Sequence, residues 1–369
     1  MVIVKSKKKV IIAMSGGVDS SVSAWLLKQK NYQVEGLFMK NWEEDDTSMY
    51  CNSTQDLYDT EEVCNKLNIY LHKINFSQEY WELVFENFLD ECKKGNTPNP
   101  DILCNKEIKF KVLFNYCMKE LKADYIATGH YACIKKINRK ISLLKSYDMN
   151  KDQSYFLYTL NEKKLKKILF PIGHLKKIQV RKIAQNISIK IAKKKDSTGI
   201  CFIGPKKMQS FLKRYISEKK GNITDINGNI LGTHDGIFYY TLGQRKGLGI
   251  GGIKGNSGNP WYVVEKKVKT NTLIVAQGSQ NKYLMSIGLI VQNCHWINQK
   301  KILFPFSCSI KTRYRQKDIL CRLEYIDDIF LKVFFIKPIL SITPGQSAVF
   351  YDEHICMGGG IIHSRIPLL

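Results

Sequence analysis

VIIAMSGGVDSS, residues 10–21, joins five apolar residues to a glycine turn and then to residues with helical spacing. A strand, a tight loop and a helix in this order are typical of the first unit of a parallel sheet. Gly16 and Gly17 allow backbone N–H groups to approach an anion, and the neighbouring serine hydroxyls add donors near the positive end of a helix. The segment therefore predicts a phosphate-binding loop.

This loop differs from a Walker A loop. No Gly-Lys-Ser or Gly-Lys-Thr follows the glycines, so the loop contains no lysine for the β- and γ-phosphates, and transfer of a γ-phosphate is disfavoured. The alternative without a ligand is a plain turn in which Asp19 or Ser20 caps the helix.

Working outward, the first third of the chain alternates between short apolar runs and amphipathic stretches. Strands are predicted at Val10–Met14, Val34–Met39, Tyr70–Asn75 and Asp124–Thr128, and helices at Ser20–Lys30, Thr54–Leu67, Gln78–Lys93 and Lys106–Lys122. The pattern indicates a doubly wound α/β domain. Because ligands of such sheets bind outside the carboxyl ends of the strands, the loops after Met14, Met39 and Thr128 are expected to form the site.

The rest of the chain changes character twice. Residues 148–202 are very basic and are predicted to be helical, with a solvated helix face as the simplest explanation of the lysines. Beyond Gly204, turn signals and a hairpin at Trp261–Val264 and Thr272–Val275 indicate a small mixed domain. The strand-like runs from Ser286 onward predict an antiparallel β-barrel. The expected domains are 1–204, 205–283 and 284–369.

Composition narrows the function class. The 369 residues carry 57 Lys+Arg against 33 Asp+Glu, a net charge of +24. Lysine contributes 49 of the 57 basic residues, which is typical of an AT-rich genome. The surplus of positive charge still favours a polyanion such as nucleic acid as the binding partner. It also discourages self-association, so a monomer is expected. No apolar run approaches the ~18 residues that cross a bilayer, and the basic start is followed by too short an apolar stretch for a secretory signal. We expect a cytosolic protein with no membrane partner.

Eleven scattered cysteines match neither a disulfide framework nor a zinc site, so reduced thiols and no metal ligands are predicted. Two cysteines stand apart. Cys104 follows two prolines and precedes a helix expected to begin near Asn105, which would lower the pKa of its thiol. Cys201 follows three lysines that could stabilise a thiolate. For each, a buried structural thiol is the alternative.

The loop resembles the SGGxDS motif of the pyrophosphatase-type ATP-binding enzymes, which split ATP between the α- and β-phosphates and adenylate a carbonyl oxygen. The resemblance implies an adenine-nucleotide alpha-hydrolase-like fold, ATP with Mg²⁺, and adenylation as the first step. The nucleotide contacts that it implies are Ala13, Met14, Ser15, Gly16, Gly17, Val18, Asp19, Ser20, Met39 and Gly129. Ala13 departs from the glycine expected there, which makes the backbone less free.

Motifs along nearly the whole chain resemble the tRNA-specific 2-thiouridylase family. They are Ser15–Ser21, Gly36–Glu44, Thr97–Phe110, Tyr125–Tyr131, Lys151–Thr159, Lys193–Gly204, Thr241–Gly252, Lys311–Gln316 and Thr343–Tyr351. The resemblance implies ATP-dependent 2-thiolation of the wobble uridine of tRNAs for lysine, glutamate and glutamine. It also implies a persulfide-donating sulfur-carrier protein as a partner.

Carried onto this sequence, the resemblance assigns three catalytic residues. Cys201 carries the persulfide, Cys104 is the nucleophile that resolves it, and Asp101 moves a proton on the flipped uridine. Contacts with tRNA are implied at Asn99, Pro100, Asp101, His130, Lys151, Asp152, Gln153, Arg313, Tyr314 and Gln346. Two alternatives stay open: another adenylating enzyme with the same loop, such as a tRNA-lysidine synthetase, and a tRNA-binding protein without catalysis.

Overall fold

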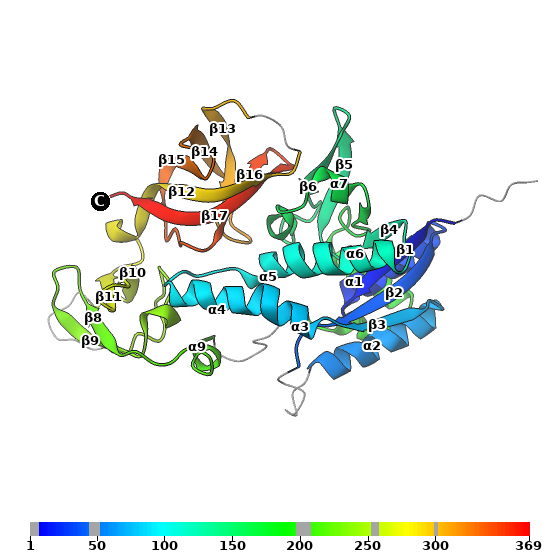
Figure 1. The fold of residues 1–369 in the computed structure, drawn as a ribbon, viewed down its shortest axis with the longest axis horizontal. Coiled ribbons are helices and arrows are strands. Elements are labelled where there is room, and N and C mark those ends of the chain that lie inside the picture. Colours follow the sequence, from blue (N-terminus) through cyan, green and yellow to red (C-terminus); the bar gives the residue numbers. More distant parts are fainter. Residues whose placement is uncertain (1–6, 44–51, 197–207, 252–257, 299–301) are drawn as a thin grey trace, which may run out of the picture.

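The computed structural model describes residues 7–43, 52–196, 208–251, 258–298 and 302–369. Three bodies follow one another along the chain, and the barrel packs above the long helices of the first (Figure 1). Cys201 lies outside the described residues.

A five-stranded parallel sheet forms the first body, in the order β3-β2-β1-β4-β7. Its strands are β1 (Lys9–Met14), β2 (Gln33–Lys40), β3 (Leu71–Asn75), β4 (Tyr125–Ala127) and β7 (Ile168–Leu169). β1 occupies the centre, and Val10, Ile11 and Ile12 are fully buried because helices cover both faces. The predicted doubly wound sheet is confirmed.

Helices connect these strands. They are α1 (Val18–Gln29), α2 (Asn52–Leu67), α3 (Ser77–Tyr80), η1 (Trp81–Phe85), α4 (Glu86–Lys93), α5 (Pro100–Leu103), η2 (Cys104–Leu113) and α6 (Phe114–Lys119). The expected start near Asn105 is wrong, since the helix begins at Pro100. The side chain of Asn99 accepts from the backbone N–H groups of Asp101 and Ile102, and proline suits the first helical position because it has no N–H to satisfy.

The prediction that residues 148–202 are helical is largely wrong. The described part holds only η3 (Ser154–Leu157), α7 (Glu162–Leu165), α8 (Lys177–Asn186) and η4 (Lys190–Lys193), together with strand β7. Ile168 and Leu169 pair in parallel with β4 instead. Tertiary pairing with an existing sheet edge overrides the weak helical propensity of so short a segment.

The central body is a four-stranded mixed sheet in the order β10-β11-β8-β9. It comprises α9 (Met208–Leu212), β8 (Gly221–Thr224), β9 (Ile230–His234), η5 (Ile237–Tyr239), β10 (Trp261–Lys267) and β11 (Thr272–Gln277). The predicted hairpin between Trp261 and Val275 is confirmed, with an antiparallel register.

The last body is a closed antiparallel β-barrel, as predicted. After η6 (Lys282–Leu284), its strands are β12 (Met285–Trp296), β13 (Phe306–Lys311), β14 (Ile319–Tyr325), β15 (Phe330–Leu340), β16 (Ser347–Asp352) and β17 (Ile355–Pro367). The order β12-β15-β14-β13-β16-β17 closes through pairing of β12 with β17. Alternate residues such as Leu289, Val333 and Phe350 fill the interior.

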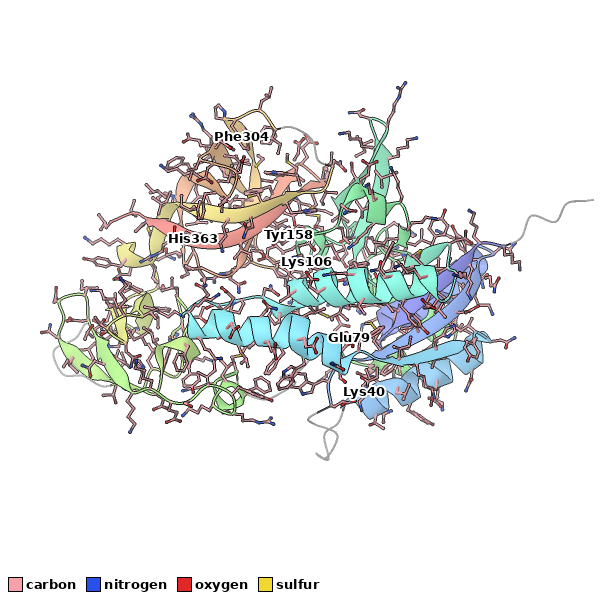
Figure 2. All side chains as sticks on the ribbon, in the orientation of Figure 1. Lys40, Glu79, Lys106, Tyr158, Phe304 and His363 are labelled. Atoms are coloured by element: carbon pink, nitrogen blue, oxygen red, sulfur yellow. The ribbon has the colours of Figure 1, made fainter. Side chains whose placement is uncertain are left out.

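A hairpin that the sequence did not predict joins the first body to the barrel. β5 (Ala132–Ile137) and β6 (Lys140–Lys145) extend the barrel sheet, because β6 pairs with β17. Between barrel and helices lies Tyr158, whose hydroxyl is 3.2 Å from the Ser347 hydroxyl oxygen (Figure 2). Tyr155 donates to the backbone carbonyl of Ser347 at 2.9 Å. These contacts hold the barrel against the η3 segment of the first body.

Candidate active site

The loop after β1 forms a cradle for an anion. Gly16 has a φ of +64°, and a Cβ placed there would lie 2.4 Å from the backbone oxygen of Asp56. Gly17 precedes α1 as its N-cap residue and provides no side-chain cap. The first N–H groups of α1 therefore lack the usual capping acceptor, which makes this helix end suited to phosphate oxygens. The alternative of Asp19 or Ser20 as the cap is not observed.

Serine hydroxyls brace this loop in the structure. Ser20 and Ser21 donate to the backbone oxygen of Gly17 at 3.1 and 2.9 Å. The backbone N–H of Ser15 donates to the Ser20 hydroxyl oxygen at 3.3 Å. The three serines thus hold the loop closed, and Ser20 can offer a hydrogen to an anion only by rotating away from Gly17.

The other implied nucleotide contacts surround the loop. Met14 and Val18 are buried in the core. Ala13 and Met39, the last residue but one of β2, are partly buried against the core. Gly129 follows β4, and a Cβ there would lie 2.8 Å from the backbone nitrogen of Ser20. Because a side chain would push the start of α1 away, glycine is required for this close approach.

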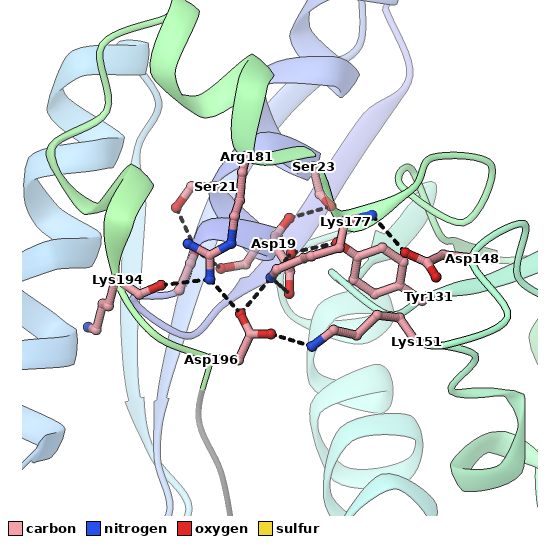
Figure 3. Close-up of polar contacts among 12 residues, drawn as sticks. Asp19, Ser21, Ser23, Tyr131, Asp148, Lys151, Lys177, Arg181, Lys194 and Asp196 are labelled. Carbon is pink, nitrogen blue, oxygen red and sulfur yellow. Dashed lines mark hydrogen bonds and ion pairs between the residues drawn. The ribbon is translucent and has the colours of Figure 1, made fainter. Parts of the chain in front are cut away.

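Charged side chains converge on the loop from segments far apart in the sequence (Figure 3). Lys177, at the start of α8, contacts both carboxylate oxygens of Asp19 at 2.7 and 2.8 Å. The Tyr131 hydroxyl donates to the same carboxylate at 2.9 Å. Lys177 also pairs with Asp196 at 2.7 Å, and Lys151 pairs with the other oxygen of Asp196.

Asp196 is the last described residue before the segment that holds Cys201. Burial acts to raise the pKa of its carboxyl, but hydrogen bonds and charges from Lys151 and Lys177 outweigh burial and lower the pKa to about 2. Arg181 adds a contact at 3.2 Å. The carboxylate is therefore ionised at neutral pH and is held beside the loop.

A second ion cluster supports the other side of the cradle. Lys194 donates to the backbone oxygen of Gly16 at 3.0 Å and pairs with Asp56 at 2.6 Å and with Asp59. Burial raises the pKa of Asp56, although Lys194 opposes the shift. The sequence interpretation missed Lys177, Lys194 and Tyr131. The available signal was the lysine clusters at Lys176–Lys182 and Lys193–Lys195. Their explanation as a solvated helix face is wrong for Lys177 and Lys194.

Cys104 lies in the helical run that begins at Pro100 and is only 5% exposed. Burial raises the pKa of its thiol, Lys109 opposes this, and Asp101 adds to it. The predicted lowering of the Cys104 pKa is therefore wrong, because the residue lies a full turn inside the helix and in the core. The described cysteines are all free thiols, as predicted.

Two titratable groups lie in, or pack against, the helical run that holds Cys104. Burial raises the pKa of Asp101, and Lys109 partly opposes the shift. His130 packs 6.1 Å from the ring of Phe110 and 6.0 Å from Phe170, and its Nδ1 is 2.8 Å from the Thr128 hydroxyl oxygen. Burial holds the pKa of His130 well below its ordinary value, so its ring is neutral at pH 7.

Of the implied tRNA contacts, Gln346, Asn99 and Pro100 lie where the barrel meets the segment before α5. Gln346 donates to the backbone oxygen of Thr97 at 2.6 Å, two residues before Asn99. A Cβ on neighbouring Gly345 would lie 2.8 Å from the Thr97 nitrogen. Asn99 itself caps the helix, and Pro100 is buried. The barrel loop thus holds the chain that leads to Asp101.

Lys151, Asp152 and Gln153 lie in three different settings. Lys151 points to Asp196, whereas Asp152 is 4% exposed and pairs with Lys311 of the barrel at 3.3 Å. Gln153 accepts from the backbone N–H of Tyr131 at 2.9 Å. These internal contacts link the barrel to the residue that bonds Asp19.

Arg313 and Tyr314 lie between β13 and β14. Arg313 is exposed and donates to the backbone oxygen of Ser341, and Tyr314 packs with its ring centroid 4.6 Å from that of Phe156. The guanidinium of the next residue, Arg315, lies 5.2 Å from the centroid of the Tyr314 ring. Basic and aromatic side chains together can contact phosphate and stack on a base.

Within the described ranges, no group of three or more His, Cys, Asp or Glu side chains is arranged to hold a metal ion. No helix among the described residues is both long enough and apolar enough to cross a membrane.

Family models match nearly the whole chain. Residues 8–205 match the tRNA methyl transferase HUP domain, residues 209–277 the tRNA methyl transferase PRC-barrel domain, and residues 286–362 the aminomethyltransferase beta-barrel domain. The matched ranges follow the three bodies of the structure.

Curated relatives match over their full length. The tRNA-specific 2-thiouridylase MnmA of Buchnera aphidicola subsp. Acyrthosiphon pisum is 70% identical over 367 residues, covering 100% of both chains. That of Buchnera aphidicola subsp. Schizaphis graminum is 69% identical, covering 99% of this chain and 100% of the relative. The protein of the same name from Salmonella paratyphi B is 57% identical over 364 residues, covering 99% of each.

Proposed function

The chain belongs to the tRNA-specific 2-thiouridylase family, and from this premise we propose that it makes 2-thiouridine at the wobble position of tRNA, using ATP. The observation that carries the proposal is the uncapped start of α1 at the glycine loop. Gly129 lies against this helix end, and the ring of the next residue, His130, packs against Phe110 in the helical run that holds Cys104. A nucleotide held at this loop would share the site with Cys104 as the proposed nucleophile and Asp101 as the proposed proton carrier. We propose lysine, glutamate and glutamine tRNAs as acceptors.

The first step is adenylation of the substrate. The C2 oxygen of uridine is a poor leaving group, so it attacks the α-phosphate of ATP, the bond to the β-phosphate breaks, and pyrophosphate leaves. Backbone N–H groups at the start of α1 would stabilise the developing negative charge. Mg²⁺ would accompany the nucleotide phosphates and supply further positive charge there. Asp101, whose pKa burial raises, would move the uridine proton.

The second step is transfer of sulfur. The terminal sulfur of a persulfide on Cys201 attacks C2, and AMP leaves with the oxygen. Cys104 then attacks the Cys201 sulfur, so the S–S bond breaks, the outer sulfur stays on C2 and a Cys104–Cys201 disulfide forms. Release of sulfide by Cys104, followed by its attack on C2, is the other route. Cys201 is five positions after Asp196 in the sequence, and Asp196 belongs to the ion cluster beside the loop.

Binding of tRNA would use all three domains, which we place at 1–204, 205–283 and 284–369. The net charge of +24 suits a polyanion, and Arg313 and Tyr314 would contact the anticodon arm. A sulfur-carrier protein would load Cys201, and the enzyme would act as a monomer.

Cysteine variants test this function. Unmodified tRNA is incubated with ATP, a persulfide donor and the enzyme, and its nucleosides are analysed by mass spectrometry for exchange of oxygen by sulfur. Cys104→Ser and Cys201→Ser are each expected to abolish thiolation, whereas Cys294→Ser, a half-buried barrel cysteine, keeps it. Full thiolation by either active-site variant would contradict the proposal.

Two further outcomes separate the alternatives. Pyrophosphate release that needs tRNA but is followed by attachment of another group would indicate a different adenylating enzyme, and a methylated nucleoside would indicate the activity named in the domain descriptions. Binding of tRNA with no release of pyrophosphate would leave a tRNA-binding protein without catalysis.

A further inference from the structure

The phosphate loop lacks a lysine of its own, yet the structure brings one to it from a distant helix. Residues 15–21 contain no basic side chain. Lys177, the first residue of α8, lies 158 positions after Asp19 and contacts both oxygens of its carboxylate. Asp19 is the second residue of α1, so the ammonium lies at the same helix end as the anion cradle.

The partners of Lys177 would keep other contacts if it moved. Its side chain is 12% exposed and its ammonium contacts Asp19 and Asp196. Asp19 would retain the Tyr131 hydroxyl, and Asp196 would retain Lys151 and Arg181. Loss of the Lys177 contacts would therefore leave neither carboxylate without a hydrogen-bond donor, which lowers the cost of releasing the ammonium.

An incoming triphosphate would change the charge balance at this point. Phosphate oxygens bound at the start of α1 lie close to the Asp19 carboxylate, and two anions repel each other strongly unless a cation lies between them. Lys177 is the cation that directly contacts Asp19 in the structure. A flexible four-carbon side chain can turn from the carboxylate to a phosphate oxygen without movement of the helix.

We propose that Lys177 binds the β- and γ-phosphates of ATP and the pyrophosphate that leaves, supplying from α8 the ammonium that the loop itself lacks. This inference rests on the proposed function for the identity of the nucleotide. In the free enzyme Lys177 neutralises Asp19. In the complex it would contact the leaving group, and Asp19 would keep the hydrogen bond from the Tyr131 hydroxyl.

Direct binding of two products tests the assignment without turnover. Inorganic pyrophosphate and AMP are titrated separately into the full-length protein by calorimetry, with and without Mg²⁺. Lys177→Met is expected to weaken pyrophosphate binding roughly 10- to 100-fold, the range for loss of a hydrogen bond between charged groups, and to leave AMP binding within about threefold. Lys182→Met, an exposed lysine on the same helix, serves as the matched control and should bind both like the unaltered protein.

A purely structural ion pair would give a different result. Equal weakening of pyrophosphate and AMP binding, or no weakening of either, would overturn the assignment. If Lys177→Met does not fold, Lys177→Gln combined with Asp196→Asn removes one carboxylate together with the ammonium, and the same contrast between the two products is expected. These titrations need no tRNA, so they test the role of Lys177 separately from thiolation. The role of Lys177 can fail while the unaltered enzyme thiolates tRNA, and thiolation can fail while Lys177 binds pyrophosphate.

Discussion

Replacing Gly16 by alanine tests whether the cradle depends on a backbone conformation that side chains avoid. The φ of +64° costs a non-glycine residue about 1–2 kcal/mol. The new Cβ would also lie 2.4 Å from the backbone oxygen and 2.7 Å from the Cα of Asp56, and such overpacking costs about 1–3 kcal/mol. The lower entropy of the unfolded alanine chain offsets about 0.4–1 kcal/mol. We expect Gly16→Ala to lower the free energy of unfolding by about 1–5 kcal/mol.

Gly17→Ala is the matched control for this change. Its φ is −101°, and the nearest atom to a new Cβ is the Ser15 hydroxyl oxygen at 3.4 Å, so stability should change by less than about 1 kcal/mol. Urea denaturation followed by circular dichroism measures both variants, and calorimetry measures ATP binding. Gly16→Ala should also lose ATP binding, because a shifted loop misdirects its N–H groups. Equal stability of the two variants would refute the steric reasoning.

Three further changes address the charged and sulfur-containing groups. Ion pairs with Lys151 and Lys177 lower the pKa of Asp196 to about 2, although burial opposes them. The ionised carboxylate therefore adds up to about 2 kcal/mol to the free energy of unfolding above pH 4, and this contribution is lost as the pH falls toward 2. Asp196→Asn should flatten acid denaturation curves in that window. Lys311→Met leaves the carboxylate of Asp152 buried without its ammonium partner, so the free energy of unfolding measured in urea should fall by about 3–5 kcal/mol. Adding Asp152→Asn should recover most of this loss. A double variant as unstable as Lys311→Met alone would argue against the pair. Burial raises the pKa of Cys104, so iodoacetamide should label it at pH 7 more slowly than it labels the amino acid cysteine in solution, and the rate should rise at alkaline pH. Peptide mass spectrometry that found Cys104 among the fastest-labelled thiols of the protein would contradict its burial.

The predicted elements that the structure confirms are those with a strong local pattern. β1 and the loop after it are encoded by adjacent residues, since an apolar run and a glycine turn specify a buried strand and a sharp reversal with little help from the rest of the chain. The barrel strands likewise alternate between interior and surface. Where the pattern is weak, as at Ile168 and Leu169, the sequence interpretation failed because pairing with β4 decided the conformation.

The hairpin β5–β6 is a second element that the local sequence pattern did not predict. Its residues include several lysines and no strong turn signal, yet Ile355 and Cys356 of the barrel pair with Leu144 and Leu143 and complete its hydrogen bonds. A strand at a sheet edge takes its stability from its neighbour, and that neighbour lies more than 200 positions away in the chain.

Short-range information was sufficient for the glycine loop, strands β1 to β4 of the parallel sheet, the barrel strands and the motifs of the family, because each depends on residues that are close together in the chain. The ammonium of Lys177 on Asp19, the bond from Tyr131, and the burial that raises the pKa of Cys104 came only from the folded chain. Electrostatic interactions and desolvation depend on distance in space, and separation along the chain carries almost no information about that distance.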